Sequence, residues 1–385
     1  MAHGNRLRPR RRTRVHFPCQ TRKGTYPVKH TVVKLGPVAA PLRPRVLGVC
    51  LALIVAAGCV FTLSIAHGDY PLGVADVWRI IGGGGTPIEN RIVIDVRLGR
   101  AVVGLLVGAA LAFSGALTQS IARNPLASPD ILGITQGSAL AAVALLTFAG
   151  TSGTLGKAAS LTLATVGLPL AAFCGGLITA TIIWLIAGRS RHSLLRFVLI
   201  GVAMATLCTS LSTWIMAHGN LDLVANARLW LTGSLNGRDL SEAWAPLIAV
   251  LVALMLASYL SFQLSALSLG DLTATMLGHN VRIAQALQLL VAVALAAVSV
   301  AAAGPIGFVA FVSPQIAMRL AGSSTPPLVT SALTGALIVC SADLLARVVL
   351  PWELPVGIVT TILGAPVLIY LIVSLNRRNN GRNNQ

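Results

Sequence analysis

The sequence predicts an all-α, polytopic membrane protein of about ten transmembrane helices, and three observations lead to this fold class. Hydrophobic residues make up 55% of the 385 residues and charged residues only 10%, whereas a soluble domain carries about 25% charge. The apolar residues form long runs, and these runs lack the apolar–polar alternation of transmembrane strands. Because a backbone in lipid must pair its own N–H and C=O groups, such runs predict helices.

The chain begins with a basic segment that we expect to be a cytoplasmic N-terminal tail over residues 1–45. It holds twelve Lys and Arg residues and no acid. Such a segment next to a membrane helix is attracted to anionic lipid and favours a cytoplasmic N-terminus. A signal peptide is less favoured, because the charged region is long and a full-length span follows. A start codon further along the chain is an alternative explanation of the segment.

Ten hydrophobic stretches follow, and they define a predicted permease domain over residues 46–376. They are 46–66, 101–119, 130–149, 160–187, 195–217, 244–265, 283–303, 305–320, 327–347 and 355–375. An even number of spans places the C-terminal tail, residues 377–385, on the side of the N-terminus. On this topology 21 Lys and Arg residues lie inside and 8 outside, while nine of the eleven acids lie outside. The pattern predicts a multi-pass protein of the inner (cytoplasmic) cell membrane with both termini in the cytoplasm.

Several chemistries find no support in the sequence. The glycine run at 82–85 is followed by Thr86 and Pro87, so it lacks the lysine of a phosphate-binding loop and predicts a flexible outer loop. Cysteines and histidines are scattered without metal-binding spacing. The net charge of +18 depends on the tail, which favours a lipid surface over nucleic acid. We therefore expect no catalytic site, no metal site and no ATPase site on this chain.

Apart from Asp130, at the first position of the third stretch, Asp343 is the only acid inside a predicted span, and Arg347 follows it at i+4. A buried charge in a membrane often marks function, so a proton relay is one reading of Asp343. The other is a local ion pair with Arg347. The scarcity of buried acids disfavours an ion-coupled secondary transporter and favours a pathway that a partner chain powers.

Four collinear segments carry a family resemblance. They read RLGR (97–100) with GLLVGAALAFSGALTQSIARNPLASPDILGITQGSALAAV (104–143), LSLGDLTATMLGHNVR (267–282), AAAGPIGFVAFVSPQIAMRL (301–320) and ADLLARVVLPWELPVGIVTTILGAPVLIYL (342–371). In this order and spacing they resemble the FecCD/BtuC-type permeases, the membrane subunits of type II ABC importers for iron siderophores, haem and vitamin B12. The resemblance covers about residues 46–376 and leaves out the basic tail.

The resemblance implies a BtuC-like fold and an assembly of several chains. In the family, two permease subunits, identical or different, pack around a central path. Two ATP-binding subunits bind below, and an external substrate-binding lipoprotein or periplasmic protein docks above. ATP and Mg²⁺ would belong to the ATP-binding subunits, so this chain would be a permease without an enzyme site or a bound cofactor.

The family's coupling helix matches residues 270–278, which lie on a predicted inner loop. The candidate ATPase-coupling residues are Gly270, Asp271, Leu272, Met276, Leu277 and Gly278. A short helix at a membrane face is able to bury apolar side chains in a groove of a partner. The alternative is an interfacial helix that lies on lipid.

Arg97, Arg100 and Arg347 match the family's external arginines, which pair with acidic residues of the binding protein. Guanidinium groups bind carboxylates in a bidentate manner and stay charged. The alternative is snorkelling at helix ends or local pairing with Asp95, Asp343 or Glu353. The family's usual proline is replaced here by glycine at position 99, which affects the rigidity of the helix entry.

The family resemblance also implies a cytoplasmic gate. Asn124 and Leu126 match the family's constriction after the second span, and Leu194 and Leu195 match a second part of it by position. A plain turn between helices is the alternative for the first pair, since Pro125 breaks the helix there. The chain departs from the family at Gln315, where a histidine is usual, and at residues 323–325, where Asp-His-Arg is common.

The outer stretch at residues 230–237, WLTGSLNG, looks more like that of siderophore permeases, including ferric enterobactin permeases, than that of vitamin B12 permeases. The resemblance therefore implies a permease that moves a ferric siderophore into the cytoplasm. Haem and cobalamin are alternative substrates. An ion-coupled secondary transporter and an exporter permease are the alternatives from other classes.

Overall fold

The computed structural model describes residues 31–35, 38–42, 44–68, 70–151, 167–187, 194–219, 221–349 and 353–383. It divides into two units, residues 1–42 and 43–385. In the first unit β1 (Thr31–Leu35) pairs antiparallel with β2 (Val38–Leu42). The segment expected as a basic tail therefore contains one strand pair, and its first 30 residues lie outside the described residues.

The described part of the second unit is helical, and ten of its helices match the ten predicted spans in order. They are α1 (Pro44–Ala66), α4 (Gly99–Ile121), α5 (Ile134–Thr151), α7 (Leu168–Ala187), α8 (Leu194–Ala217), α10 (Trp244–Ser268), α12 (Val281–Ala303), α13 (Val309–Ala321), α14 (Leu328–Val348) and α15 (Val356–Asn383). Seven of the described helices are long and apolar enough to cross a membrane, and three shorter apolar helices account for the remainder. The predicted all-α polytopic fold is confirmed for this unit.

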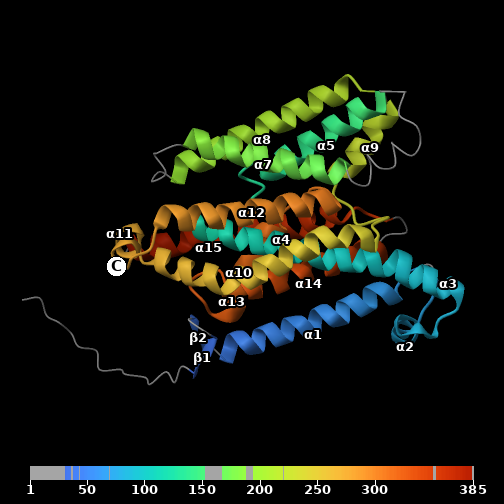
Figure 1. Cartoon of the computed structure of the whole chain (residues 1–385), viewed down its shortest axis with the longest axis horizontal. Helices are drawn as coiled ribbons and strands as arrows, with labels where there is room; N and C mark the ends of the chain where they lie inside the picture. The colour runs from blue at the N-terminus through green and yellow to red at the C-terminus, as the bar shows by residue number, and fades with distance from the viewer. Residues whose placement is uncertain are drawn as a thin grey trace, which may run out of the picture. The chain divides into compact units, whose positions relative to one another are not determined.

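Short helices cover the two ends of the bundle. Figure 1 shows α2 (Val74–Arg79), α3 (Pro87–Asn90) and α9 (Leu221–Leu231) at one end and α11 (Asp271–Met276) at the other. Between α2 and α4 the chain also forms η1 (Ile80–Gly84) and η2 (Arg91–Leu98), and η4 (Leu240–Ala243) precedes α10. The glycine run predicted as a flexible loop lies mostly within η1, where Gly83 adopts a φ of 91°, a conformation open to glycine.

Helix α4 is the centre of the fold, and nearly all of its residues are buried. It packs against α14, α12 and α13. A Cβ at Gly115 would lie 1.7 Å from the carbonyl oxygen of Ala310 in α13, and one at Gly108 would lie 2.4 Å from that of Gly335 in α14. Small residues therefore allow the helices to approach closely. In lipid, helices associate mainly through such packing, because the lipid tails are as apolar as the side chains.

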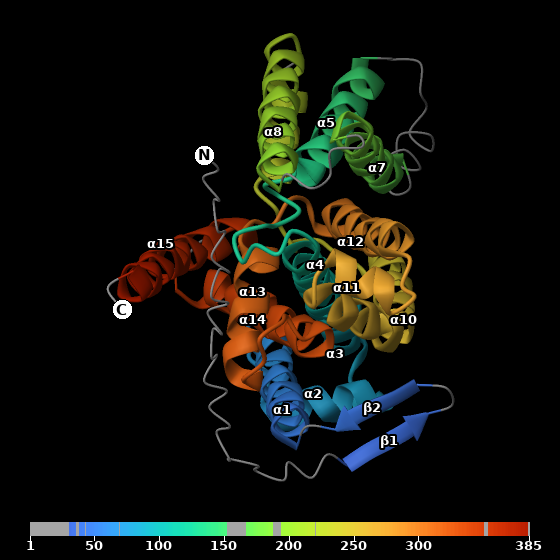
Figure 2. The same ribbon diagram turned by 90° about the vertical axis from the view of Figure 1, so that its left-hand side faces the viewer.

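The outer helices expose large apolar side chains, as expected for a surface in contact with lipid. Leu51 on α1 and Met255 on α10 are 63% and 78% exposed. Figure 2 shows α5, α7 and α8 grouped beside α12, and α7 and α5 both contact α12. Apolar side chains thus cover the outside of the bundle, in agreement with the mean hydropathy of +0.80.

The connection between α12 and α13 interrupts the predicted span at 305–320, because helix begins only at Val309. Gly304 and Phe308 adopt φ angles of 75° and 67°. A Cβ at Gly304 would lie 2.5 Å from the carbonyl oxygen of Trp230, and Ser234 N–H donates to the Ala303 carbonyl at 2.9 Å. The break therefore packs against the last turn of α9 and the chain that follows it.

Candidate functional site

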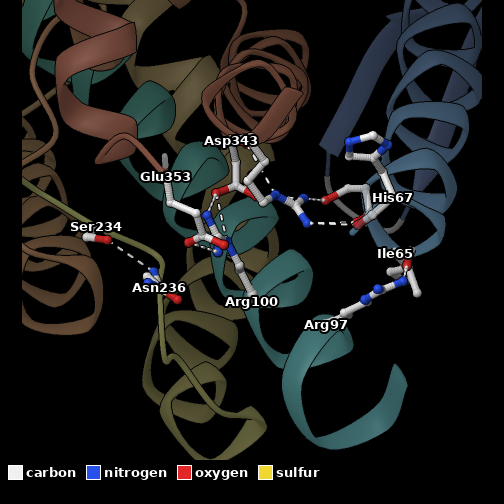
Figure 3. Close-up of polar contacts among 10 residues, drawn as sticks. Ile65, His67, Arg97, Arg100, Ser234, Asn236, Asp343 and Glu353 are labelled. Carbon is white, nitrogen blue, oxygen red and sulfur yellow. Dashed lines mark hydrogen bonds and ion pairs between the residues drawn. The ribbon is translucent and has the colours of Figure 1, made fainter. Parts of the chain in front are cut away.

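Arg100 and Arg347, two of the three predicted docking arginines, share one buried carboxylate. Arg100 Nε and Nη2 each lie 3.0 Å from Asp343 Oδ1, and Arg347 Nη2 lies 3.0 Å from Asp343 Oδ2. The Asp343 side chain is only 3% exposed. Figure 3 shows Arg100, Asp343 and Glu353 converging at one end of the bundle. The predicted local pair between Asp343 and Arg347 is confirmed.

Two further contacts extend this arginine cluster, by which we mean Arg100, Arg347, Asp343 and Glu353. Arg100 Nη1 donates to Glu353 Oε2 at 3.0 Å, and the Glu353 side chain is 51% exposed. Arg347 donates to the carbonyl and the hydroxyl of Ser64 at the end of α1. The cluster therefore joins α1, α4, α14 and the segment before α15, and Glu353 is its exposed member.

Arg97, the third predicted docking residue, lies apart from this cluster and binds the end of α1. Its guanidinium donates to the carbonyls of Ile65, Ala66 and Tyr70 at 2.9, 3.2 and 2.9 Å. The last carbonyls of a helix lack partners within the helix, so Arg97 satisfies them. All three arginines are thus engaged within the chain in this conformation, and docking remains a prediction.

The predicted gate residue Asn124 forms a tight turn after α4. Its N–H donates to the Gln119 carbonyl at 3.1 Å, and its Oδ1 accepts from the N–H of Leu126 at 2.9 Å. Leu126 packs against a cluster that contains Phe311 and Val312 of α13. The structure confirms a turn at this position, while its action as a gate stays a prediction. Leu194 and Leu195 begin α8, but their side chains lie outside the described residues.

A buried pair of glutamines lies beside this turn and was not predicted. Gln315 Nε2 donates to Gln119 Oε1 at 2.6 Å, and Gln119 Nε2 donates to the Phe311 carbonyl at 2.9 Å. The pair joins α4 to α13. The available signal was the polar residue at 315 in a position where the family usually has histidine.

The predicted coupling segment forms a short exposed helix. Gly270 precedes α11 with a φ of 101°, and Gly278 follows it with a φ of 85°. Leu272, Met276 and Leu277 are 80%, 85% and 61% exposed. These exposed apolar side chains fit a groove on a partner chain or a lipid surface, and the coupling role stays a prediction.

Arg123 contacts this segment and was also missed by the sequence analysis. Its Nη2 pairs with Asp271 Oδ1 and donates to the Leu267 carbonyl at 2.9 Å. The two partners are 144 and 148 residues away along the chain. No local spacing rule connects residues at such a separation, so only the fold revealed the contact.

The described residues hold no group of three His, Cys, Asp or Glu side chains that could bind a metal ion. A bundle of apolar helices with a buried arginine cluster at one end and an exposed apolar helix at the other defines a multi-pass membrane protein of the transporter type. The chain belongs to the FecCD transport family, whose sequence model matches residues 52–374.

The chain is similar to characterised permeases over most of its length. It is 34% identical over 335 residues to the ferric enterobactin transport system permease protein FepG of Escherichia coli. This match covers 87% of this chain and 98% of FepG. It is 41% identical over 288 residues to the Fe(3+) dicitrate transport system permease protein FecD of Escherichia coli. This match covers 74% of this chain and 86% of FecD. The family and the helical fold predicted from the sequence are therefore confirmed.

A solved structure shares the fold. It is described as an inward-facing conformation of a putative metal-chelate type ABC transporter, and it matches with a TM-score of 0.73 and 27% sequence identity. The match covers 85% of this chain and 99% of the solved chain. Nearly the whole of that solved chain is therefore matched by this one.

Proposed function

We propose that this chain is the permease subunit of an ABC importer that moves a ferric siderophore into the cytoplasm. The observation that carries the proposal is its similarity to the permeases for ferric enterobactin and ferric dicitrate, each of which is matched over 86% or more of its length. Both names describe permeases for iron chelates. Large anionic or neutral chelates of Fe³⁺ are accordingly the proposed substrate class.

ATP hydrolysis takes place on a separate subunit in this proposal, and ATP and Mg²⁺ are bound there. The exposed side chains of Leu272, Met276 and Leu277 on and after α11 would occupy a groove on each ATP-binding subunit. Two such subunits and a second permease subunit, identical or different, complete the transporter. The end of the bundle that holds α11 then faces the cytoplasm, together with both termini.

An external binding protein docks at the opposite end in the proposal. Arg100 and Arg347 are held by Asp343, and Glu353 is the half-exposed carboxylate on Arg100. A carboxylate of the binding protein would replace Glu353 on Arg100, because exchange of one exposed carboxylate for another leaves the buried pair intact. This arrangement reconciles a docking role with the internal pairing that the structure shows.

Uptake in a deletion strain tests the function. A strain that lacks its siderophore permeases would receive this chain with its ATPase and binding-protein partners, and radiolabelled iron would be supplied on a panel of siderophores, with haem and labelled cobalamin in parallel. We expect iron uptake from at least one siderophore and none of haem or cobalamin. Uptake that persists without the ATPase would refute the proposal in favour of an ion-coupled transporter.

Docking variants distinguish import from export. Charge reversal at the outer end, Arg100→Glu, would abolish uptake while Arg282→Gln, at the opposite end and exposed, would leave it intact. Because removal of Arg100 also breaks a buried pair, the membrane level of each variant must be measured. Normal uptake by a stable Arg100→Glu variant would contradict the docking role.

A further inference from the structure

The guanidinium of Arg123 contacts the chain on both sides of the glycine that joins α10 to α11. Leu267 belongs to the last turn of α10 and Asp271 is the first residue of α11, and Arg123 contacts both. Between them lies Gly270, whose φ of 101° is a conformation that side chains rarely adopt. No atom lies within 4 Å of a Cβ built at Gly270. The direction of α11 relative to α10 is thus set at this glycine and held by Arg123.

The backbone conformation of Arg123 indicates that its side chain has a role of its own. Its φ is 45°, and Phe308 is the only other non-glycine residue with a positive φ in the described ranges. Glycine meets this conformation without strain, whereas any residue with a Cβ is disfavoured there. The turn alone would therefore be served best by glycine. An arginine at this position brings the contacts with Asp271 and Leu267 that glycine would lack.

Arg123 is directly continuous with the turn predicted to form the gate. The next residue, Asn124, closes the end of α4 through the Gln119 carbonyl and accepts from the N–H of Leu126. Ala127 N–H then donates to the Asn124 carbonyl at 3.1 Å. Each residue from Arg123 to Ala127 except Pro125 is thus tied by a hydrogen bond, and the segment is able to transmit a displacement rather than absorb it.

The ion pair itself is too exposed to be a strong stabiliser. The side chains of Arg123 and Asp271 are 45% and 34% exposed, and exposed pairs contribute little to folding stability. A purely structural role therefore predicts that loss of the Arg123 side chain has little consequence for the protein.

We infer that Arg123 is a positioning residue that carries the movement of α11 to the turn at residues 124–126. This inference rests on the proposed function, in which α11 contacts an ATP-binding subunit. Movement of that subunit displaces Asp271, the bonded guanidinium follows, and the turn shifts against Phe311 and Val312 of α13. ATP hydrolysis and opening of the path are thereby coupled through one side chain.

The experiment measures uptake and ATP hydrolysis together in the complete transporter in proteoliposomes, with the siderophore that the wild type accepts. Arg123→Gln and Arg123→Gly would each lower the amount of iron taken up per ATP hydrolysed by about fivefold or more, the lower end of typical coupling between sites. Arg123→Gly is the decisive variant, because it suits the turn and removes only the side chain. Arg123→Lys would retain more of the coupling than Arg123→Gln does, because it keeps the positive charge.

Controls separate coupling from assembly. Arg282→Gln, an exposed arginine at the start of α12, would keep the wild-type ratio of uptake to hydrolysis. The amount of ATP-binding subunit that co-purifies would stay unchanged in every Arg123 variant. Wild-type ratios for both Arg123→Gln and Arg123→Gly would overturn the inference while the proposed function stands. A wild-type transporter that accepts no siderophore would instead overturn the proposed function.

Discussion

Asp343→Asn is the substitution that tests the arginine cluster most directly. Asp343 is 3% exposed and lies between Arg100 and Arg347, whose side chains are each 9% exposed. The isosteric amide keeps the volume but removes the negative charge, so Arg100 would keep only the half-exposed Glu353 as a carboxylate partner and Arg347 would lose its ion pair. Loss of one partner from a buried ion pair costs about 3–5 kcal/mol. We expect the free energy of unfolding of the purified protein to fall by this amount in a denaturant titration in mild detergent.

A matched control and an apolar replacement sharpen the result. Asp76 pairs with Arg79 at 3.2 Å, but both side chains are about half exposed, so Asp76→Asn should cost at most about 1 kcal/mol. A triple variant, Arg100→Met with Asp343→Leu and Arg347→Met, should recover most of the stability, since apolar replacement of a buried ion pair is often neutral. A loss below about 1 kcal/mol for Asp343→Asn would refute the reasoning from burial. Loss of uptake at unchanged stability would instead support the proton relay.

Three further variants and one control, Gly58→Ala, test the packing and the coupling surface. Gly115→Ala places a Cβ 1.7 Å from a carbonyl oxygen of α13 and should cost about 1–3 kcal/mol, whereas Gly58→Ala, which meets no atom within 4 Å, should raise the thermal midpoint slightly. Gln315→Leu leaves the side-chain Oε1 of Gln119 without its buried donor and should cost about 1–3 kcal/mol in the same melting assay; an unchanged midpoint would contradict the pair. Met276→Asp, at an 85% exposed position, should leave the midpoint unchanged but abolish co-purification of the ATP-binding subunit, and retained co-purification would contradict the docking surface.

The spans were predictable because lipid imposes one strong rule. A run of about 20 apolar residues must form a helix to pair its backbone, and a described helix lies in each of the ten stretches. Boundaries were less secure where glycine and proline occur. Pro305 and Gly307 fall within a stretch that is apolar enough to read as helix, yet Gly304 and Phe308 adopt positive φ angles there.

The sequence identified the candidate residues but not the contacts that they make. The segment matched to the family's coupling helix forms the short exposed helix α11, and its role in coupling stays a prediction. Local pairing of the arginines with Asp343 or Glu353 was one of the sequence-based alternatives, and the structure shows both pairs. The backbone carbonyls that accept from Arg97 carry no side-chain signal in the sequence.

The sequence by itself determined that the chain is a membrane protein, the order of its apolar helices and its family, since these depend on composition, on local runs and on local motifs. Only the tertiary structure decided which polar groups meet: it placed Asp343 between two arginines, Gln119 against Gln315, and Arg123 beside Asp271 and the Leu267 carbonyl. Such contacts join helices whose separation along the chain has no bearing on their separation in space. Close packing of α4 on α13 and α14 brings such side chains together, because the glycines at these contacts allow the helices to approach closely.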